Sequence, residues 1–508
     1  MIILFIQANG LSESIGLCNL SSFLKKHGHQ SGLILLSHSK NVYKDIEDSR
    51  PDILGFSAFT GMHKDVFASA EEFKKNTGIP VIIGGPHTTF YPECIEDYPF
   101  IDYISSGEGE YSLLALLERL KVKGNTLDVP GISARGLDGK IYRNGISANI
   151  DDIQSMPIPD RDLYYKKYPF LAALPMKRFI SGYGCPYDCT FCNEPWLRRE
   201  MKIPNSRFVR KKSVEQVLEE ISDIRSKYPL KRVHFSDDLF TFDIRWLAKF
   251  TEIYKKNFKI PYSCNLRFNL LNEATAALLK DGNCYAVQVG LESGSQNLRN
   301  IVLKKDISDE DIIKGAALLK KYGIKIYTTN IIGLPGETLE DALSTIRINH
   351  RIKADFFRIN TLMPFPRTEI FDMAARQGQL VDKDVLIKDF STEDSLHLFC
   401  KTDNANEFKN IAVLFFYMVK FPFLYGLFKR IIKRRHSAFI RMFGFINIIQ
   451  DTLYFNISLL QGFRFFYNTI LCSSTGTDLH WVPFKISVFQ KLFSGLKCKR
   501  IQKTTANE

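Results

Sequence analysis

Short apolar runs alternate with helical stretches over the first 121 residues of this 508-residue chain. Strands buried on both faces read as continuous apolar runs, and helices that cover a sheet repeat their apolar positions every three to four residues. The alternation predicts a doubly wound parallel (Rossmann-like) α/β sheet that binds ligands at the carboxyl ends of its strands. The predicted strands are Ile2–Ile6, Gly32–Leu36, Ile53–Ser57, Val81–Gly84 and Asp102–Ser105, and the predicted helices are Leu17–His27, Val42–Glu47, His63–Asn76 and Tyr111–Leu120.

A second alternating region covers residues 178–370. Six strand and helix units favour a full or partial (β/α)6 barrel, whose site would lie at the carboxyl ends of the strands. Ser308 is the expected N-cap of one helix, because three acidic residues follow it in the first turn. The predicted strands are Arg178–Ser181, Arg232–Phe235, Tyr262–Asn265, Ala286–Gly290, Ile324–Ile331 and Phe356–Thr361, and the predicted helices are Val214–Lys227, Arg245–Lys256, Glu273–Leu279, Ser308–Tyr322 and Leu339–His350.

A connector separates the two regions. Pro130–Arg135 and Lys140–Arg143 read as a hairpin around the Leu137-Asp138-Gly139 turn, and two prolines make Met156–Asp160 an extended linker. We therefore expect four parts. They are a ligand-binding domain over 1–125, a linker with a hairpin over 126–175, a barrel over 176–370, and a basic, aromatic, mainly helical region over 371–508.

Positive charge is concentrated at the C-terminal end of the chain. The whole chain has 68 Lys and Arg against 55 Asp and Glu, whereas residues 408–508 alone have 15 against 3. No apolar run there reaches the roughly 20 residues that a membrane-spanning helix needs. Three interpretations remain open: a helical cap on the barrel with a solvated basic face, an amphipathic surface that contacts anionic lipid, or a nucleic-acid surface. The absence of a recognisable RNA-binding module makes nucleic acid an unlikely partner.

The cysteines and the first residues indicate the compartment. Ten cysteines in 508 residues are too few for a disulfide framework and fit a reducing environment. The apolar N-terminus lacks the basic stretch of a signal peptide and reads as a first strand. We expect a cytoplasmic protein, with peripheral contact at the inner membrane face through residues 408–508 as an option.

Three cysteines with C-x3-C-x2-C spacing follow the first strand of the predicted barrel. They are Cys185, Cys189 and Cys192, and Gly182-Tyr183-Gly184 leads into them. One tight loop with three thiolates can hold a four-iron cluster whose fourth iron stays open to a small molecule. A zinc site is the alternative, and it would need a fourth ligand from Cys264 or His234.

The cysteine spacing, with Phe191 before the third cysteine, resembles the radical S-adenosylmethionine (radical SAM) superfamily. Further elements of that superfamily follow in order along the chain. They are Ser236-Asp237-Asp238-Leu239-Phe240, Gly290-Leu291-Glu292-Ser293-Gly294 (G-x-E-S-G), Gly333-Leu334-Pro335-Gly336-Glu337-Thr338 (G-x-P-G-E-T) and Pro364-Phe365-Pro366-Arg367-Thr368. The last resembles P-[FY]-P-G-T, with Arg367 in place of glycine.

The resemblance implies a 4Fe-4S cluster on the three cysteines and S-adenosylmethionine beside it. Glu292 would accept hydrogen bonds from the ribose, Asp237 or Ser236 would hold the ammonium group, and Arg267 would pair with the carboxylate. An ordinary salt bridge is the alternative for Arg267. The full predicted set for this cofactor is Ser236, Asp237, Arg267, Glu292, Ser293, Gly333 and Pro335.

Glycine-rich turns after the third, fourth and fifth strands resemble the cobalamin-binding domain of one radical SAM branch. That branch includes the anaerobic magnesium-protoporphyrin monomethyl ester cyclases and the hopanoid and natural-product methylases. The predicted cobalamin residues are Ser57, Thr60, Gly84, Gly85, His87, Gly107 and Glu108. Ordinary βα turns are the alternative. Residues 9–14 lack the histidine of the D-x-H-x-x-G motif of other cobalamin domains, so ligation of cobalt through that motif is not expected.

The resemblance implies an enzyme that forms a 5′-deoxyadenosyl radical and methylates an unactivated carbon of an unknown, lipid-like or other small-molecule substrate. A flavodoxin-like or ferredoxin-like protein would supply the electron. Two alternatives stay open. The same radical chemistry could drive oxidative cyclisation or rearrangement without methyl transfer, or the chain could be a non-catalytic cobalamin-binding sensor.

Overall fold

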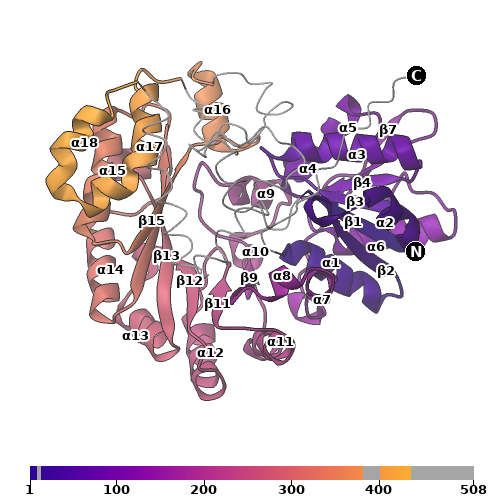
Figure 1. Ribbon diagram of the computed structural model, residues 1–508, viewed down its shortest axis with the longest axis horizontal. Helices are drawn as coiled ribbons and strands as arrows, with labels where there is room; N and C mark the ends of the chain where they lie inside the picture. Colours follow the sequence, from indigo (N-terminus) through magenta and orange to yellow (C-terminus); the bar gives the residue numbers. More distant parts are fainter. Residues whose placement is uncertain (9–12, 381–400, 436–508) are drawn as a thin grey trace, which may run out of the picture.

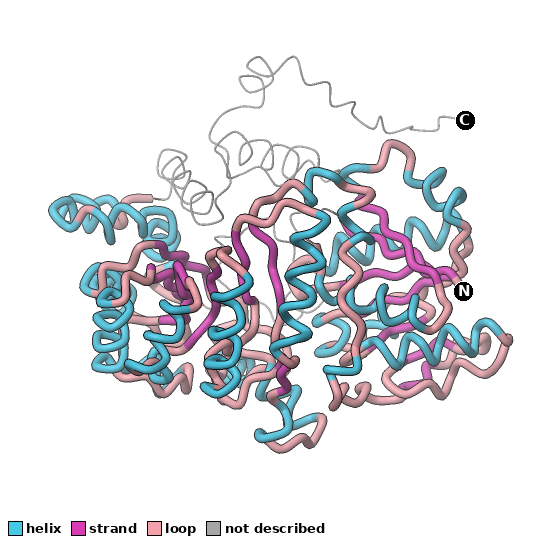
Figure 2. The backbone as a smooth tube through the Cα atoms, turned by 90° about the horizontal axis from the view of Figure 1, so that it is seen from below, coloured by secondary structure: helices cyan, strands magenta, loops and turns pink. Residues whose placement is uncertain are grey.

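The computed structural model describes residues 1–8, 13–380 and 401–435. Its two larger sheets, whose strands are mainly parallel, lie side by side (Figures 1 and 2). The N-terminal sheet has the order β2-β1-β3-β4-β5-β6-β7, and its first five strands are parallel. This is the predicted doubly wound sheet, with each predicted strand within two residues of its position. The strands are β1 (Ile2–Gln7), β2 (Gln30–Leu35), β3 (Ile53–Ser57), β4 (Val81–Gly84), β5 (Tyr103–Ser105), β6 (Ile132–Arg135) and β7 (Ile141–Arg143).

Helices cover both faces of this sheet (Figure 1). Ser14 caps α1 by accepting from the Leu17 N–H, and the apolar faces of the helices are buried against the strands. The helices are α1 (Ile15–Lys26), α2 (Val42–Ser49), α3 (His63–Thr77), α4 (Pro86–Phe90), α5 (Cys94–Asp97) and α6 (Gly109–Lys121).

The predicted hairpin is present as β6 and β7, which pair antiparallel. β6 also pairs antiparallel with β5, so the hairpin extends the N-terminal sheet rather than standing alone in the linker. Short helices α7 (Asp162–Tyr165) and α8 (Pro169–Ala172) then lead to the second sheet.

The second sheet is a parallel half-barrel with the order β15-β14-β13-β12-β11-β8. Among the described residues β8 and β15 do not pair, so the barrel is partial rather than closed. Its strands are β8 (Met176–Phe179), β11 (Arg232–Phe235), β12 (Tyr262–Leu266), β13 (Cys284–Glu292), β14 (Lys325–Ile332) and β15 (Phe356–Thr361), and its helices are α11 (Val214–Lys227), α12 (Ile244–Asn257), α13 (Glu273–Asp281), α14 (Asp309–Lys321) and α15 (Leu339–Arg351). Ser308 caps α14 as predicted, in a capping box with Asp311.

A buried arginine joins the two sheets. Arg161 lies 2.5 Å from Glu13, which follows β1, and 2.9 Å from Glu220 of α11, and it donates to the Arg178 carbonyl at 2.6 Å. An unpaired charge would be costly at this depth, and the two carboxylates balance the charges of Arg161 and of buried Lys212, which lies 3.3 Å from Glu220. The pairing fixes the loop after β1 against the first strand of the barrel.

Three helices follow the barrel in the described residues: α16 (Glu369–Arg376), α17 (Ala405–Lys420) and α18 (Tyr425–Ile431). α17 packs on β15 and α15, with the rings of Phe415 and Phe357 5.5 Å apart. None of the helices in the described ranges is both long and apolar enough to cross a bilayer. The rest of the predicted C-terminal region, 381–400 and 436–508, lies outside the described residues.

Candidate functional site

The three cysteines lie in one loop between β9 (Gly182–Tyr183) and α9 (Glu194–Glu200). β9 pairs with β10 (Arg210–Lys211), after the short helix α10 (Asn205–Phe208). Gly184 has φ +86°, and a Cβ there would lie 2.3 Å from the Phe208 carbonyl oxygen, so only glycine fits at the start of the loop.

The thiols sit in a sheltered environment. Cys189 is buried and the other two are half-buried, and burial raises the pKa of Cys185 to about 11 and that of Cys192 further. Binding to iron would have to displace these protons, as thiolate ligation does in general. In the part of the chain that the structure describes, no three His, Cys, Asp or Glu side chains are already arranged as an ion site.

The two residues considered as a fourth zinc ligand lie in strands of the barrel. His234 of β11 is buried with its Nδ1 2.9 Å from the Ser263 hydroxyl, and Cys264 of β12 is fully buried. Both residues are thus held in the interior of the barrel by its strands rather than in the cysteine loop.

Arg267, at the end of β12, braces the cysteine loop. Its guanidinium lies 3.6 Å from the centre of the Tyr187 ring, Nη1 lies 3.5 Å from the Cys189 sulfur, and Nη2 donates to the Lys305 carbonyl. The structure thus places Arg267 beside the cysteine loop and gives it partners there that the sequence did not indicate; its role towards S-adenosylmethionine stays a prediction.

Asp237 is fully engaged at the end of β11. Its carboxylate accepts from the Ser181 N–H at 2.7 Å and the Ser181 hydroxyl at 2.5 Å, and it pairs with Lys211 at 2.8 Å. These bonds hold the ends of β8, β10 and β11 together. Ser236 is half-buried beside it, and its N–H donates to the Phe179 carbonyl.

Glu292 is held over the end of β13 in an unusual backbone conformation. Its φ is +64°, and its Oε1 lies 3.1 Å from Lys305 Nζ in a buried ion pair. A Cβ at Gly290 would lie 2.1 Å from that oxygen, which explains the glycine two residues before it. Such left-handed strain in a non-glycine residue is typical of functional sites.

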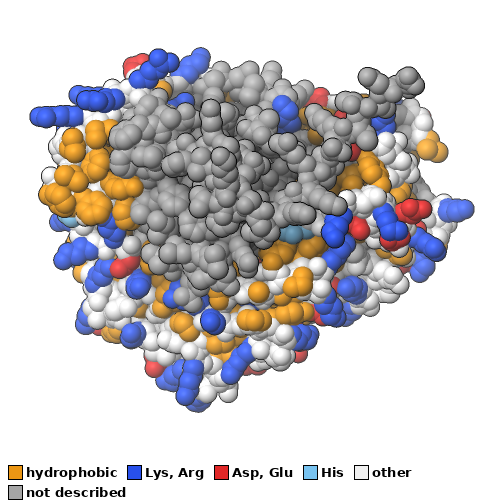
Figure 3. Space-filling model, viewed as in Figure 1, with side chains coloured by type: hydrophobic (Ala, Val, Ile, Leu, Met, Phe, Trp, Pro, Cys, Tyr) orange, Lys and Arg blue, Asp and Glu red, His pale blue; other side chains and the backbone are white. Residues whose placement is uncertain are grey.

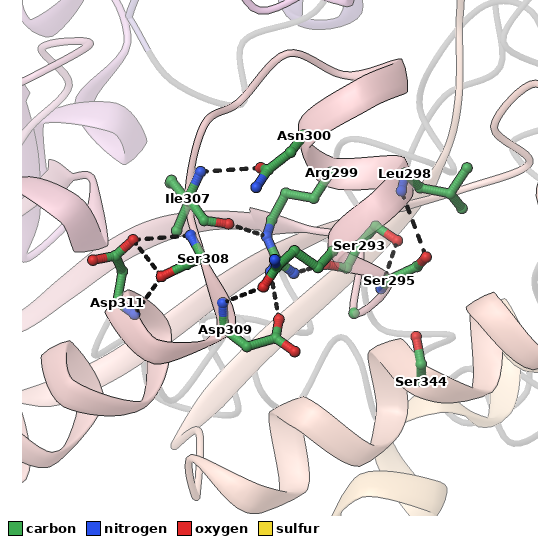
Figure 4. A network of polar contacts seen from close by, with 12 residues as sticks. Ser293, Ser295, Leu298, Arg299, Asn300, Ile307, Ser308, Asp309, Asp311 and Ser344 are labelled. Atoms are coloured by element: carbon green, nitrogen blue, oxygen red, sulfur yellow. Dashed lines mark hydrogen bonds and ion pairs between the residues drawn. The ribbon is translucent and has the colours of Figure 1, made fainter.

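The turn after Glu292 is fixed by a buried arginine (Figure 4). Arg299 donates to the carbonyls of Ser293 and Ile307, both at 2.7 Å, and pairs with Asp309. Ser293 is buried, and its hydroxyl accepts from the Ser295 N–H at 3.2 Å. The network ties the G-x-E-S-G element to the start of α14.

Glu337 organises the next strand end. Its Oε2 accepts from the N–H groups of Gly333 and Leu334 at 2.6 and 2.9 Å. Burial raises the pKa of this carboxyl to about 8. Gly333 has φ +83°, so the G-x-P-G-E-T turn, with Pro335 at its centre, depends on a glycine and on an internal carboxyl acceptor.

A cavity of about 380 Å³ opens at the carboxyl ends of the strands of the N-terminal sheet. Five of the seven predicted cobalamin residues line it: Ser57, Gly84, Gly85, Gly107 and Glu108. The glycine-rich lining leaves backbone exposed to a flat, bulky ligand, so these residues fit cobalamin.

Thr60 and His87 are not among the lining residues. They contact each other, with the Thr60 hydroxyl 3.0 Å from His87 Nδ1, and the His87 ring stacks on His63 with centres 4.0 Å apart. Burial lowers the pKa of His87 to about 3, so it is neutral. Asn9 to Ser12 of the stretch that lacks a histidine lie outside the described residues.

Residues of the second domain complete the cavity. Tyr183 and Lys212 line it, and the Tyr183 hydroxyl accepts from Asn19 of α1 at 3.0 Å. Arg210 forms a two-pronged ion pair with Glu108, at 2.5 and 2.9 Å. Tyr183 lies two residues before Cys185, so the antiparallel β9–β10 pair joins the cavity to the cysteine loop. These contacts could not be predicted from the sequence, because they depend on how the two domains meet.

Two family models match the segments that form the two sheets. Residues 179–348 match the radical SAM superfamily, and residues 1–117 match the B12-binding domain. The chain therefore combines a radical SAM domain with a B12-binding domain. These two domains indicate a 4Fe-4S cluster, S-adenosylmethionine and cobalamin as the cofactors.

Curated relatives are similar to this chain at low identity. An uncharacterized methyltransferase of Pyrococcus horikoshii is 28% identical over 344 residues, which cover 67% of this chain and 73% of the relative. The anaerobic magnesium-protoporphyrin IX monomethyl ester cyclase of Rubrivivax gelatinosus is 24% identical, covering 72% of this chain and 66% of the relative.

Two solved structures share the fold. The cobalamin-dependent S-adenosylmethionine radical enzyme OxsB superposes with a TM-score of 0.66 at 18% identity, over 97% of this chain and 75% of its own. The radical S-adenosylmethionine methyltransferase TsrM from Kitasatospora setae, with cobalamin and a 4Fe-4S cluster bound, gives a TM-score of 0.60 at 17% identity, over 74% and 78%. At this identity the likeness shows the shared architecture.

Proposed function

We propose that this enzyme methylates an unactivated carbon of a small-molecule substrate. The observation that carries the proposal is the position of Tyr183, which lines the glycine-rich cavity and lies two residues before Cys185. A cobalamin in that cavity and a cluster on that loop would thus be neighbours across the domain boundary.

The cofactors supply the difficult chemistry when bound: one-electron cleavage of S-adenosylmethionine to start a radical reaction, and a transferable methyl group from cobalamin. The protein supplies position and shelter. Arg267 and Tyr187 hold the cysteine loop, Glu292 offers a carboxylate for ribose hydroxyls, and Asp237 stabilises the strand ends beneath the site. The other proposed S-adenosylmethionine contacts are Ser236, Ser293, Gly333 and Pro335.

The names of the relatives support methyl transfer but leave a second outcome. The Pyrococcus horikoshii protein is named a methyltransferase, and a relative from Rhodopseudomonas palustris, 25% identical, is named hopanoid C-2 methylase. The relative from Rubrivivax gelatinosus is named a cyclase. Oxidative cyclisation or rearrangement by the same radical start is therefore the second candidate.

The proposal also includes two partners and a location. The partners are a lipid-like substrate and a flavodoxin-like or ferredoxin-like electron donor, and the location is the inner membrane face, contacted peripherally. Radical SAM enzymes need an electron donor, and a small acidic redox protein would suit the exposed Arg199 and Arg207 near the cysteine loop. The lipid-like substrate is supported by the basic, aromatic character of the C-terminal region.

The test uses isotope transfer. Strains with and without the enzyme are grown with methionine carrying a trideuterated methyl group, and their extracts are compared by mass spectrometry. We expect a product that is heavier by the labelled methyl group only when the enzyme is present. A product that depends on the enzyme but carries no label would reject methyl transfer in favour of cyclisation or rearrangement. If the anaerobically reconstituted protein forms no 5′-deoxyadenosine, the sensor alternative replaces both.

A further inference from the structure

The turn between α17 and α18 exposes three large apolar side chains. Phe421 is 37% exposed, Phe423 79% and Leu427 52%. The rings of Phe421 and Phe423 pack edge to face with centres 6.0 Å apart. These residues lie where the α17–α18 hairpin projects at one end of the molecule (Figures 1 and 2).

Phe421 packs on Tyr417 of α17, with ring centres 6.4 Å apart, but Phe423 and Leu427 add little to the packing of the hairpin. The opposite face of α17 is buried on β15 and α15, with Phe408, Ile411 and Phe415 at most 2% exposed. Phe428 and Ile432 bury the inner face of α18. Asn410 donates to the Ile432 carbonyl at 2.8 Å, which closes the hairpin. Phe423 and Leu427 therefore expose apolar surface that the packing of the hairpin does not require.

Basic residues accompany the exposed apolar ones. Leu427 and Arg430 are three residues apart on α18 and share one face of that helix, while the exposed Phe423 and Arg434 lie just before and just after it. Residues 408–435 contain seven Lys and Arg and no Asp or Glu. Figure 3 shows the hydrophobic side chains gathered at this end of the molecule, with basic ones beside them. We call Phe421–Arg435 the hairpin tip.

We infer that the hairpin tip docks on an anionic lipid surface. Phe423 and Leu427 would enter the boundary between headgroups and acyl chains, and Arg430 and Arg434 would lie against the phosphates. α18 has seven residues, too few to span a bilayer, so the tip lies on the membrane.

Charge and shape favour lipid over the other occupants. An RNA surface would use a basic groove with ring faces available for stacking, whereas the tip projects and includes an aliphatic Leu427. A second copy of the chain would bring the same positive charge against itself, and close approach of like charges is unfavourable. The inference goes beyond the proposed reaction, because docking requires no turnover.

The experiment is vesicle flotation with the full-length, cofactor-loaded enzyme. We compare vesicles of pure phosphatidylcholine with vesicles containing about one third phosphatidylserine. The wild type should float with the anionic vesicles and much less with the neutral ones. The double variant F423S/L427S should bind at least tenfold more weakly. The double variant R430Q/R434Q should lose about fivefold per charge removed and most of its preference for phosphatidylserine.

Matched controls separate the tip from general surface effects. L137S changes an exposed leucine in the β6–β7 turn, and K280Q/K325Q removes two exposed charges from the barrel. Both should float like the wild type. Formation of 5′-deoxyadenosine in vesicle-free solution, unchanged in every variant, shows that the folds and cofactors are intact.

Four results would overturn the inference. One is equal flotation of the wild type with both kinds of vesicle. Another is flotation of F423S/L427S at the wild-type level, which would assign binding to another part of the chain. The third is a dimeric wild type in light scattering that F423S/L427S converts to a monomer. The fourth is binding of transfer RNA that the tip variants abolish while flotation persists. Failure here leaves methyl transfer untouched, because the isotope test does not depend on vesicles.

Discussion

Arg367 of the half-barrel is paired with Glu93 of the N-terminal domain. Its Nη2 lies 2.6 Å from Glu93 Oε1, and its Nε donates to the Phe90 carbonyl at 3.2 Å. Phe90 in turn packs edge to face on Trp196, with ring centres 5.0 Å apart. α4 follows the Gly84-Gly85 turn and α9 follows Cys192, so these contacts join the helices behind the two cofactor loops.

Replacing Arg367 by glycine should change the relative position of the cysteine loop and the glycine-rich cavity without unfolding the protein. The radical would then be formed without efficient conversion of the substrate. Arg367 has φ +68°, where a non-glycine residue costs about 1 kcal/mol, so R367G relieves strain while it removes the contacts to Glu93 and Phe90. The pair is partly exposed, so its loss should change the free energy of unfolding by no more than about 1 kcal/mol. We expect the ratio of 5′-deoxyadenosine to final product to rise several-fold.

The matched control for this variant is E96Q. Glu96 lies in α5, whose N-cap is Glu93, but it pairs with Arg143 within the N-terminal domain. It should leave the ratio unchanged, whereas E93Q should raise it as R367G does. An unchanged ratio in R367G would mean that the domain contact does not position the cofactors.

Cys192→Ala should remove the cluster and all turnover while cobalamin binding persists. Two thiolates cannot hold the four-iron cube that three are expected to anchor. The glycine-rich cavity is lined by the N-terminal domain, the linker, Tyr183 and Lys212, and Cys192 is not among its lining residues. Iron and sulfide content and the visible absorbance of bound cobalamin check both parts. Cys94→Ala, a buried thiol in α5, should keep its iron. Turnover by the Cys192 variant would overturn the assignment of the loop.

The sequence predicted most of the fold because its signals were local. Apolar runs and capping residues such as Ser308 act within a few residues, so strands and helices were found nearly in place. Contacts between distant segments were not predictable in this way. Lys305 as partner of Glu292, and Arg210 as partner of Glu108, depend on how strands and domains meet. Arg367 departed from the glycine of its motif, and only its contact with Glu93 explains an arginine in that conformation.

Gly84→Leu should weaken cobalamin binding with little effect on the cluster. Gly84 lines the cavity, and the nearest atom to an added Cβ is 3.6 Å away, so the backbone tolerates a side chain that would take up cavity volume. We expect at least a tenfold rise in the dissociation constant for cobalamin, measured by absorbance titration, with iron content unchanged. Gly124→Leu, in the exposed loop after α6, is the control. Wild-type affinity in G84L would place cobalamin elsewhere.

Glu337→Gln should make the free energy of unfolding decrease less steeply with rising pH than it does in the wild type. The pKa of Glu337 is about 8 in the folded protein and about 4.5 in the unfolded chain, so the folded state holds its proton more tightly. Stability that depends on this proton is present at low pH and is lost as pH rises from about 4.5 towards 8. Over pH 5 to 8 the loss could reach roughly 4 kcal/mol, an upper bound from 1.36 kcal/mol per unit.

Glutamine can accept the same two N–H groups of Gly333 and Leu334 but does not titrate. E337Q should therefore match the wild type near pH 5 and exceed its denaturation midpoint at pH 8. E219Q, an exposed carboxyl on α11, should keep the wild-type pH profile. If E337Q and the wild type lost stability in parallel between pH 5 and 8, the buried carboxyl would not be the group that titrates there.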